Sequence, residues 1–331
     1  MRSMNGCIQC RVGYGALLLV IFSAVLSAVR ADSEAIPKES HSAPDTASID
    51  SLGAAGFGNR VFDLGSIVVS AIRSDETAFR LPVTAQAVYS QSIQLHRPGR
   101  TLPEALRDIP AVSVQKTSYG HGSPYIRGFT GFHTLLLVDG IRLNNSVFRE
   151  GPNQYAGTID PLGVARIEVV KGPGSSLYGS DAVGGTVNVV TSRPLIHSRG
   201  NALHSETYYR YSTADNSNVG RMEVSGSFGA TLGISGSYFG KTFGDLRPGG
   251  GPVLPRTGYD ESGMNLGLEY LAGDNMKIEA AHQRMDQDDV WRTHRTVYSV
   301  DWLNTTHGND RHLSTDQHRD LSYLRLKSSL Q

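Results

Sequence analysis

A glycine-rich run between Gly172 and Gly185 is the segment of this sequence whose spacing most suggests ligand chemistry. Closely spaced glycines let backbone amides approach a phosphate, as in nucleotide-binding loops. Leu177, however, occupies the third glycine position of the dinucleotide fingerprint, and no Gly-Lys-Ser/Thr ending follows. We therefore interpret these glycines as positions of close backbone packing.

Catalytic chemistry is not predicted elsewhere in the chain. Cys7 and Cys10 precede the apolar run of the N-terminal leader, so a cleaved product would have no disulfide, thiolate metal site or cysteine nucleophile. The sequence contains no Gly-x-Ser-x-Gly elbow and no His-Glu-x-x-His pair. Serine, histidine and aspartate are abundant, but no spacing assembles them into a triad. We expect no enzyme activity, no cofactor and no metal site.

The first 31 residues predict a secretory signal peptide. Arg2 and Arg11 precede an apolar run at residues 16–26, and a possible cleavage site follows at Val29-Arg30-Ala31. The apolar run is too short to span a bilayer comfortably, because a membrane helix needs about 20 residues. A short membrane anchor is the alternative. Residues 32–66, rich in Ser, Ala, Pro, Asp and Gly, predict a flexible exported segment.

Residues 67–80 contain a short β-prone island and a linker. The island consists of Ile67, Val68, Val69, Ser70 and Ala71, with flexible composition on both sides. Such a segment can add a strand to the exposed sheet edge of a partner protein. The alternative is that it is simply a first edge strand of the following domain.

Residues 81–194 predict one compact α+β domain of about 110 residues, a common domain size. A capping box of Thr101 and Glu104 marks a short helix at residues 102–107. Asp139-Gly140, directly after an apolar run, predicts a hairpin turn. We predict strands at residues 83–89, 111–115, 123–127, 134–138, 166–170 and 186–191.

From residue 195 the sequence changes to strict two-residue alternation. One face of the segment at residues 221–228 carries Met222, Val224, Gly226 and Phe228, and the other carries Arg221, Glu223, Ser225 and Ser227. Residues 231–238 and 264–270 alternate in the same way, and residues 203–211 alternate less cleanly. Such segments are what the wall of a transmembrane β-barrel requires, although a soluble β-sandwich alternates too. A short turn at residues 229–230 and a long loop at 241–262 favour the membrane barrel.

Charge makes nucleic acid an unexpected partner, because the formal net charge is zero and no long basic run is present. Near the end of the chain, Asp286-Gln287-Asp288-Asp289 and the following Trp291-Arg292-Thr293-His294-Arg295 predict a solvated, charged extracellular loop. A calcium or ligand site there is the alternative.

Four strings in the predicted α+β domain resemble the plug domain of TonB-dependent outer-membrane receptors. They are residues 125–129 (Tyr-Ile-Arg-Gly-Phe), 136–143 (Leu-Leu-Val-Asp-Gly-Ile-Arg-Leu), 166–173 (Arg-Ile-Glu-Val-Val-Lys-Gly-Pro) and 174–191 (Gly-Ser-Ser-Leu-Tyr-Gly-Ser-Asp-Ala-Val-Gly-Gly-Thr-Val-Asn-Val-Val-Thr). Each string alone is weak, but the four stand in order between an export signal and barrel-like strands.

The resemblance implies a fold and a function. The fold would be an α+β plug domain followed by antiparallel transmembrane β-barrel strands, in the outer membrane of a Gram-negative-type bacterium. The function would be uptake of a small nutrient ligand such as a ferric siderophore, haem or cobalamin. Residues 67–71 would be the TonB box, bound by a TonB-type energy-transducing protein, and outer-membrane lipid would surround the barrel.

The resemblance also implies roles for individual residues. Arg127 and Lys171 occupy the positions of basic plug residues that pair with barrel carboxylates and hold the plug in place, although the second position usually holds arginine. Glu168 would serve as a local partner, with an ordinary exposed charge as the alternative. Candidate ligand contacts lie in two plug segments, residues 118–122 and 144–154, and at Tyr155 just beyond the second. They comprise Tyr119, His121, Phe148, Arg149 and Tyr155.

Receptors of this family close a barrel of about 22 strands, at about ten residues a strand. The 137 residues from 195 onward suffice for about six strands. We therefore expect the barrel to be incomplete in this chain, which would be a fragment or truncated product. The alternative is a non-transporting exported binding or adhesion protein built on a plug-like domain with a soluble β tail.

Overall fold

The computed structural model divides the chain into two compact units, Met1–Phe62 and Asp63–Gln331. The predicted signal peptide and flexible segment, residues 1–66, lie outside the residues that the structure describes. All described residues belong to the second unit. They are residues 68–69, 76–77, 84–95, 100–144, 150–194, 196, 201–273, 275–292 and 313–328.

The α+β domain is built on a five-stranded sheet in the order β3-β8-β9-β6-β7. These strands are β3 (Thr84–Tyr89), β6 (Thr134–Val138), β7 (Ile141–Arg142), β8 (Val164–Lys171) and β9 (Gly185–Thr191). Strand β6 pairs with β9 in parallel, and the other neighbours are antiparallel. The four longer strands confirm the sequence prediction to within two residues at each end.

The predicted hairpin joins β6 to β7. Asp139 and Gly140 both have positive φ, +52° and +78°, between the paired residues Val138 and Ile141. Positive φ at both central residues is what a type I′ turn requires, and it explains the Asp-Gly sequence. The predicted turn is therefore confirmed.

Shorter elements complete this domain. Strands β4 (Val112–Gln115) and β5 (Ser123–Ile126) form a separate antiparallel pair. The predicted helix is a 3-10 helix, η2 (Leu102–Leu106), in which the Glu104 carboxylate accepts a hydrogen bond from the Thr101 amide at 3.3 Å. The remaining helical turns are α2 (Ser90–Leu95), η3 (Gly131–His133), η4 (Tyr155–Thr158), η5 (Pro161–Gly163), α3 (Ser175–Tyr178) and η6 (Ser180–Ala182).

The main apolar core joins the sheet to α2, η2 and η4. Ile167 and Val169 of β8 face it, and Leu102 and Leu106 of η2 are almost fully buried in it. Burying such aliphatic side chains is the main stabilising term in a domain of this size.

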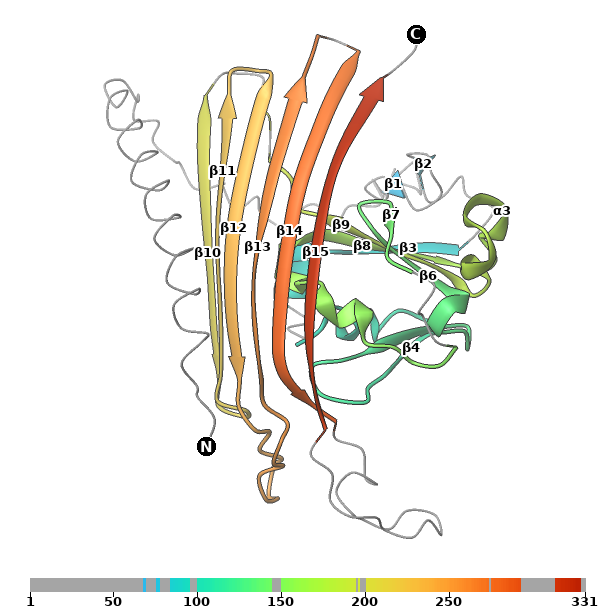
Figure 1. Cartoon of the computed structure of the whole chain (residues 1–331), viewed down its shortest axis with the longest axis vertical. Helices are drawn as coiled ribbons and strands as arrows, with labels where there is room; N and C mark the ends of the chain where they lie inside the picture. The colour runs from blue at the N-terminus through green and yellow to red at the C-terminus, as the bar shows by residue number, and fades with distance from the viewer. Residues whose placement is uncertain are drawn as a thin grey trace, which may run out of the picture. The chain divides into compact units, whose positions relative to one another are not determined.

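The C-terminal region forms a six-stranded antiparallel sheet in simple chain order (Figure 1). Its strands are β10 (Ala202–Ser212), β11 (Ser217–Phe228), β12 (Leu232–Phe243), β13 (Tyr259–Leu271), β14 (Met276–Trp291) and β15 (Ser314–Ser328). The predicted short turn is present at residues 229–231. The long loop predicted at residues 241–262 is shorter in the structure, at residues 244–258, because β12 and β13 extend into both of its ends. Within the described residues, β10 and β15 are the two edges, so the sheet is open there.

The acidic run at residues 286–289 corrects one prediction. It is not a loop but the far part of β14, paired with β15 and interrupted by a register shift between Gln287 and Val290. Asp289 has a positive φ of +58° at this irregularity. A polar sequence is compatible with a strand here because Gln287 is fully buried and bonded to neighbouring strands, which composition alone does not indicate.

The two faces of the six-stranded sheet differ as the alternation predicts. The polar face is largely buried, with Arg221, Ser235, Glu269 and Gln283 among its members. The opposite face exposes large apolar side chains: Met222, Phe228, Ile234, Tyr238, Leu266, Leu268, Tyr270, Leu324 and Leu326. A sheet with its apolar side chains outward and its polar ones inward has the pattern of a lipid-facing barrel wall.

Among the described residues, no helix is both long enough and apolar enough to cross a membrane.

Candidate functional site

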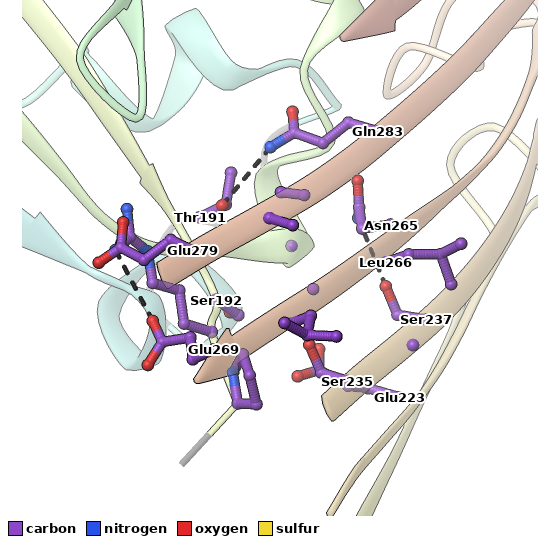
Figure 2. A pocket seen from close by; sticks show the side chains of 18 of the residues that line it. Thr191, Ser192, Glu223, Ser235, Ser237, Asn265, Leu266, Glu269, Glu279 and Gln283 are labelled. Carbon is purple, nitrogen blue, oxygen red and sulfur yellow. Dashed lines mark hydrogen bonds and ion pairs between the residues drawn. The ribbon is translucent and has the colours of Figure 1, made fainter. Parts of the chain in front are cut away.

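The buried polar face of the six-stranded sheet, which we call the wall, contacts the α+β domain of residues 84–194, which we call the plug. A small cavity lies between them (Figure 2). Beside it, Gln283 Nε2 of β14 lies 3.5 Å from Thr191 Oγ1 of the plug. The volume of the cavity is about 30 Å³. That suffices for a water molecule or two, whereas sites for small-molecule ligands measure about 300–1,000 Å³. The cavity therefore belongs to the interface and is not a nutrient site.

On one side of the cavity, the plug residue Asp160 is buried between two wall cations. Its carboxylate lies 2.9 Å from Arg221 Nη1 and 2.9 Å from Lys241 Nζ. The same side chain caps η5 by accepting a hydrogen bond from the Leu162 amide at 3.1 Å. Burial alone would raise the pKa of Asp160, but Lys241 and Arg221 outweigh it and hold that pKa below its usual value.

Each of these wall cations has a carboxylate of its own on the wall. Arg221 Nη2 lies 2.7 Å from Glu223 of the same strand. Lys241 Nζ lies 3.0 Å from Glu261 of β13. Glu261 in turn accepts a hydrogen bond at 2.8 Å from Gln287. The wall part of this cluster is therefore electrically neutral before Asp160 is added.

The backbone approaches the wall closely at Gly163, three residues after Asp160. A Cβ atom at Gly163 would lie 3.1 Å from Arg221 Nη1, 3.1 Å from Asn265 Nδ2 and 3.3 Å from Asp160 Oδ2. A side chain at this position would displace the groups that hold Asp160. Glycine is what allows the turn before β8 to lie this close to the wall.

On the other side of the cavity, Arg193 follows the last plug strand and meets carboxylates from both domains. Its guanidinium lies 2.8 Å from Glu279 and 3.7 Å from both Glu269 and Asp139. Burial would lower the pKa of Arg193, but these carboxylates raise it, so the side chain stays charged. Glu269 and Glu279 also pair with wall lysines, including Lys277 at 2.9 and 3.3 Å.

The Asp139 turn carries further contacts to the wall. Its carboxylate accepts hydrogen bonds from Tyr323 at 3.1 Å and Gln283 at 3.2 Å. Its backbone carbonyl accepts one from Arg325. Within the plug, the same carboxylate binds the amide and hydroxyl of Thr191 at 2.9 and 2.7 Å. The turn is thus tied to strand β9 and to two wall strands at once.

Near the long loops of the wall, the plug segment at residues 118–122 is held by side chains of β14 and β15. Gln287 donates a hydrogen bond to the Gly120 carbonyl at 3.1 Å. Gln317 lies 2.6 Å from the His121 ring nitrogen Nε2. Arg100 of the plug pairs with Asp215 in the turn after β10. Polar contacts therefore run along the whole length of the interface.

Comparison with protein families decides what the plug is. Residues 77–186 match the family model described as the TonB-dependent receptor plug domain. The plug is therefore a TonB-dependent receptor plug domain, and the chain is similar to a fragment of the TonB-dependent receptors of the outer membrane. The match covers the first three strings noted in the sequence and most of the fourth, and in the sheet it covers β3, β6, β7 and β8 and the start of β9.

Curated relatives match a longer part of the chain than the family model does. A vitamin B12 transporter, BtuB, of Vibrio vulnificus is 32% identical over 178 residues, which cover 51% of this chain and 28% of the relative. An iron-regulated outer membrane virulence protein of Vibrio cholerae is 31% identical over 201 residues, covering 55% of this chain and 30% of the relative. The chain thus spans less than a third of the length of these relatives.

Solved structures share the fold. A ferric enterobactin receptor of Pseudomonas aeruginosa aligns with a TM-score of 0.55 at 18% identity, over 80% of this chain and 40% of that one. The siderophore receptor PirA of Acinetobacter baumannii aligns with a TM-score of 0.54 at 17% identity, over 74% and 37%. These likenesses support the plug and the incomplete barrel that the sequence predicts.

The structure places the expected plug residues of the receptor only in part as anticipated. Arg127 is exposed, has a positive φ of +52° and lies beside Gly172, because a Cβ there would be 3.2 Å from Arg127 Nη1. Lys171 bonds Gln86 at 2.5 Å and the Pro110 carbonyl at 2.8 Å. Among the described residues, neither cation forms an ion pair with a wall carboxylate.

The expected pairing of Lys171 with Glu168 is not found. The two residues are three apart on β8, so their side chains point to opposite faces of the sheet. Glu168 is fully buried and binds Arg166 at 2.8 Å and Asn188 at 3.1 Å. The error came from reading sequence proximity as spatial proximity, which fails on a strand at odd spacing.

The expected ligand residues are partly buried in the receptor. Tyr119 is half-buried beneath Arg100, whose guanidinium carbon lies 5.3 Å from the ring centroid. His121 is buried against the wall, and Tyr155 packs against the apolar core of the plug. Phe148 and Arg149 lie outside the described residues.

Of the expected TonB box, the structure describes only Val68 and Val69. Their backbone forms a two-residue strand, β1, paired with β2 (Glu76–Thr77). Ile67, Ser70 and Ala71 lie outside the described residues.

Sequence reasoning missed Asp139, Asp160 and Arg193 as interface residues. The sequence of the wall did contain a usable signal. Its strands were predicted to have one face toward the membrane, and charged residues recur on their opposite, polar face. An inward charge in a membrane protein needs a partner. The alternation did not indicate which plug residue would supply it.

Proposed function

We propose that this chain is the front part of an outer-membrane receptor that takes up a scarce nutrient, with energy supplied by a TonB-type protein. The observation that carries the proposal is the plug held against the polar face of a wall whose other face is apolar. A lipid-exposed sheet needs a polar partner on its inner side, and the plug supplies it.

The character of the interface supports transport. Most of the contacts described above are made by charged or polar side chains around a small cavity. One apolar cluster joins the two parts as well, where Tyr119 and Leu162 of the plug pack against Val219, Phe243, Tyr259 and Val290 of the wall. An apolar interface would resemble a domain core and would hold permanently, whereas a polar one exchanges its contacts for water at modest cost. A plug bound in this way can be displaced without unfolding the wall.

We infer that residues 67–71 are the point at which the energy-transducing protein binds. The segment is β-prone and precedes β3, which lies at the edge of the plug sheet. An extended segment that adds to the sheet edge of a partner gains backbone hydrogen bonds along its length. A pull on it would reach the plug through β3.

Arg127 and Lys171 remain our candidates for a second attachment of the plug. The positive charge of Arg127 contributes to lowering the pKa of Lys171, after burial, so the two like charges lie near each other. Two adjacent cations favour a carboxylate partner. We propose that this partner lies on barrel strands of the full-length receptor, which at the length of the curated relatives would have many more strands than these six.

The nutrient that fits best is a ferric siderophore or a cobalamin, with haem as a further candidate. The relatives described above include a vitamin B12 transporter and siderophore receptors. We propose that residues 118–122 and 144–155 carry the plug contacts to this ligand, because the first segment lies near the long loops of the wall. Tyr119, His121, Phe148, Arg149 and Tyr155 are the candidate contacts.

The test uses the full-length receptor that contains this chain, purified in detergent. Binding of ferric enterobactin, haem and cyanocobalamin would be measured by titration, and uptake of the bound compound in cells with and without the TonB-type protein. We expect binding of one compound and uptake only with the energy-transducing protein. A protein that stays soluble without detergent and binds none of the three would instead be an exported binding or adhesion protein.

A further inference from the structure

We propose that Arg221 and Lys241 form a charge-compensated socket in the wall, which Asp160 of the plug enters and leaves as the plug moves. In this view Asp160 is a positioning residue, and the wall is built to remain stable when the carboxylate departs. The inference rests on the proposed transport function, since it concerns how the plug is released.

The charges around Asp160 support reversible release. Removing one partner of a buried ion pair is normally strongly destabilising, because it leaves a buried charge uncompensated. Here Arg221 keeps Glu223 at 2.7 Å and Lys241 keeps Glu261 at 3.0 Å when Asp160 leaves. Two wall cations and two wall carboxylates then remain, so no orphan charge is left on the wall.

The departing carboxylate also has access to water. The cavity between plug and wall is lined by Gly163 and Arg221, which lie next to Asp160, and by Glu223, the wall partner of Arg221. Water entering there can hydrate Asp160 as its contacts with the wall break. The desolvation cost of docking is therefore recovered on release.

The second charged contact across the interface follows the same rule with the opposite sign. Here the plug residue is a cation, Arg193, and the wall residues are Glu269 and Glu279. Glu269 pairs with Lys277 at 2.9 Å, and Glu279 with Lys327 at 3.0 Å. These wall carboxylates also stay paired without their plug-side partner. Two independent clusters with this property indicate that the wall is arranged for separation.

Asp160 lies where a pull on the N-terminal segment would be felt. Asp160 is the N-cap of η5, and η5 leads directly into β8. Strand β8 is in turn hydrogen-bonded to the whole of β3. The end of this ladder, Tyr89 with Arg166, is the part nearest in sequence to Asp160. Displacement of β3 would therefore draw β8 and the preceding loop away from the socket.

The test is amide hydrogen exchange on the purified full-length receptor, which needs neither nutrient nor energy source. Asp160→Asn keeps the helix cap, because asparagine also caps well, but removes the charge. We expect exchange at residues 158–168 to become about tenfold faster, while exchange in β11, β12 and β13 stays unchanged. The matched control is Asp181→Asn, since Asp181 pairs with Arg142 inside the plug.

Two further variants keep the result decisive. Lys241→Met leaves Asp160 with Arg221 alone, so we expect a smaller acceleration at residues 158–168. Glu261→Gln removes the compensation of Lys241, and combined with Asp160→Asn it should accelerate exchange in β12 as well. If Asp160→Asn alone accelerates exchange in β12, the pair is an ordinary structural one and the socket is refuted. Unchanged exchange at residues 158–168 would refute it too.

These outcomes are independent of the nutrient assays. A receptor that binds none of the compounds but shows the selective exchange pattern would overturn the proposed function and keep the socket. A receptor that transports but lacks the pattern would do the reverse.

Discussion

The carboxylate of Asp139 and the hydroxyl of Tyr323 lie 3.1 Å apart, one on a plug turn and the other on a wall strand. Asp139 therefore both shapes the turn and contacts the wall. Asp139 adopts a positive φ that few residue types tolerate, and its buried carboxylate also binds Thr191 and Gln283. Its type is therefore constrained twice, by the backbone and by its partners.

We expect Asp139→Asn to destabilise the plug on the wall by about 1–3 kcal/mol. Asparagine tolerates the positive φ, so the turn should persist. Its amide nitrogen, however, is a donor facing the donors of Tyr323 and Gln283. The measurement is the free energy of unfolding of the purified receptor in denaturant. Asp260→Asn is the control, because Asp260 is exposed on the outer face of β13. Equal effects of the two changes would contradict the role assigned to Asp139.

Gly163→Ala should weaken the same interface from the plug side. The added Cβ would meet Arg221 and Asn265 at 3.1 Å, so these side chains or the loop must shift, and a loss of about 1–3 kcal/mol is expected. Gly151→Ala is the matched control, since a Cβ at Gly151 would meet nothing within 4 Å. Thermal unfolding of both variants provides the comparison. A stability of Gly163→Ala equal to that of the control would show that the close approach is not required.

The outer face of the wall can be tested for contact with lipid. Leu324 is 76% exposed on that face of β15. In a bilayer, Leu324→Arg should cost about 2–4 kcal/mol near the midplane and less toward the interfaces. Ser328→Arg, on the same face at the end of the strand, should cost much less. Folding yield and unfolding in lipid vesicles would be measured for both. A harmless Leu324→Arg would favour a water-exposed sheet and the soluble alternative.

The pKa of Asp160 predicts how the interface responds to acid. Because this pKa is lowered in the folded receptor, the carboxylate contributes its full stability above the ordinary value of 3.8. That contribution is lost as the pH falls through the lower, folded value. The stability difference between wild type and Asp160→Asn should be constant between about pH 7 and pH 5 and shrink toward pH 3. A difference that disappears already near pH 5 would contradict the assigned direction of the shift.

Much of the fold follows from local rules that a sequence displays. The Asp139-Gly140 turn, the strands of the plug and the two faces of the wall were all predicted, because turn chemistry and side-chain alternation act over a few residues. The family also follows from four short strings. The same local rules failed at residues 286–289, where a polar composition was taken for a loop although its alternate residues fit a strand.

The interface itself was decided only by the tertiary structure. Alternation indicates that Arg221 faces inward, whereas Lys241 was placed in the long loop. The sequence also does not indicate that both cations meet Asp160, which is 61 residues from Arg221 in the chain. Glu168 was matched with Lys171 by proximity in sequence, and the folded strand turned them to opposite faces. Charge pairing depends on distance in space and on burial, and these exist only after the plug and the wall have packed together.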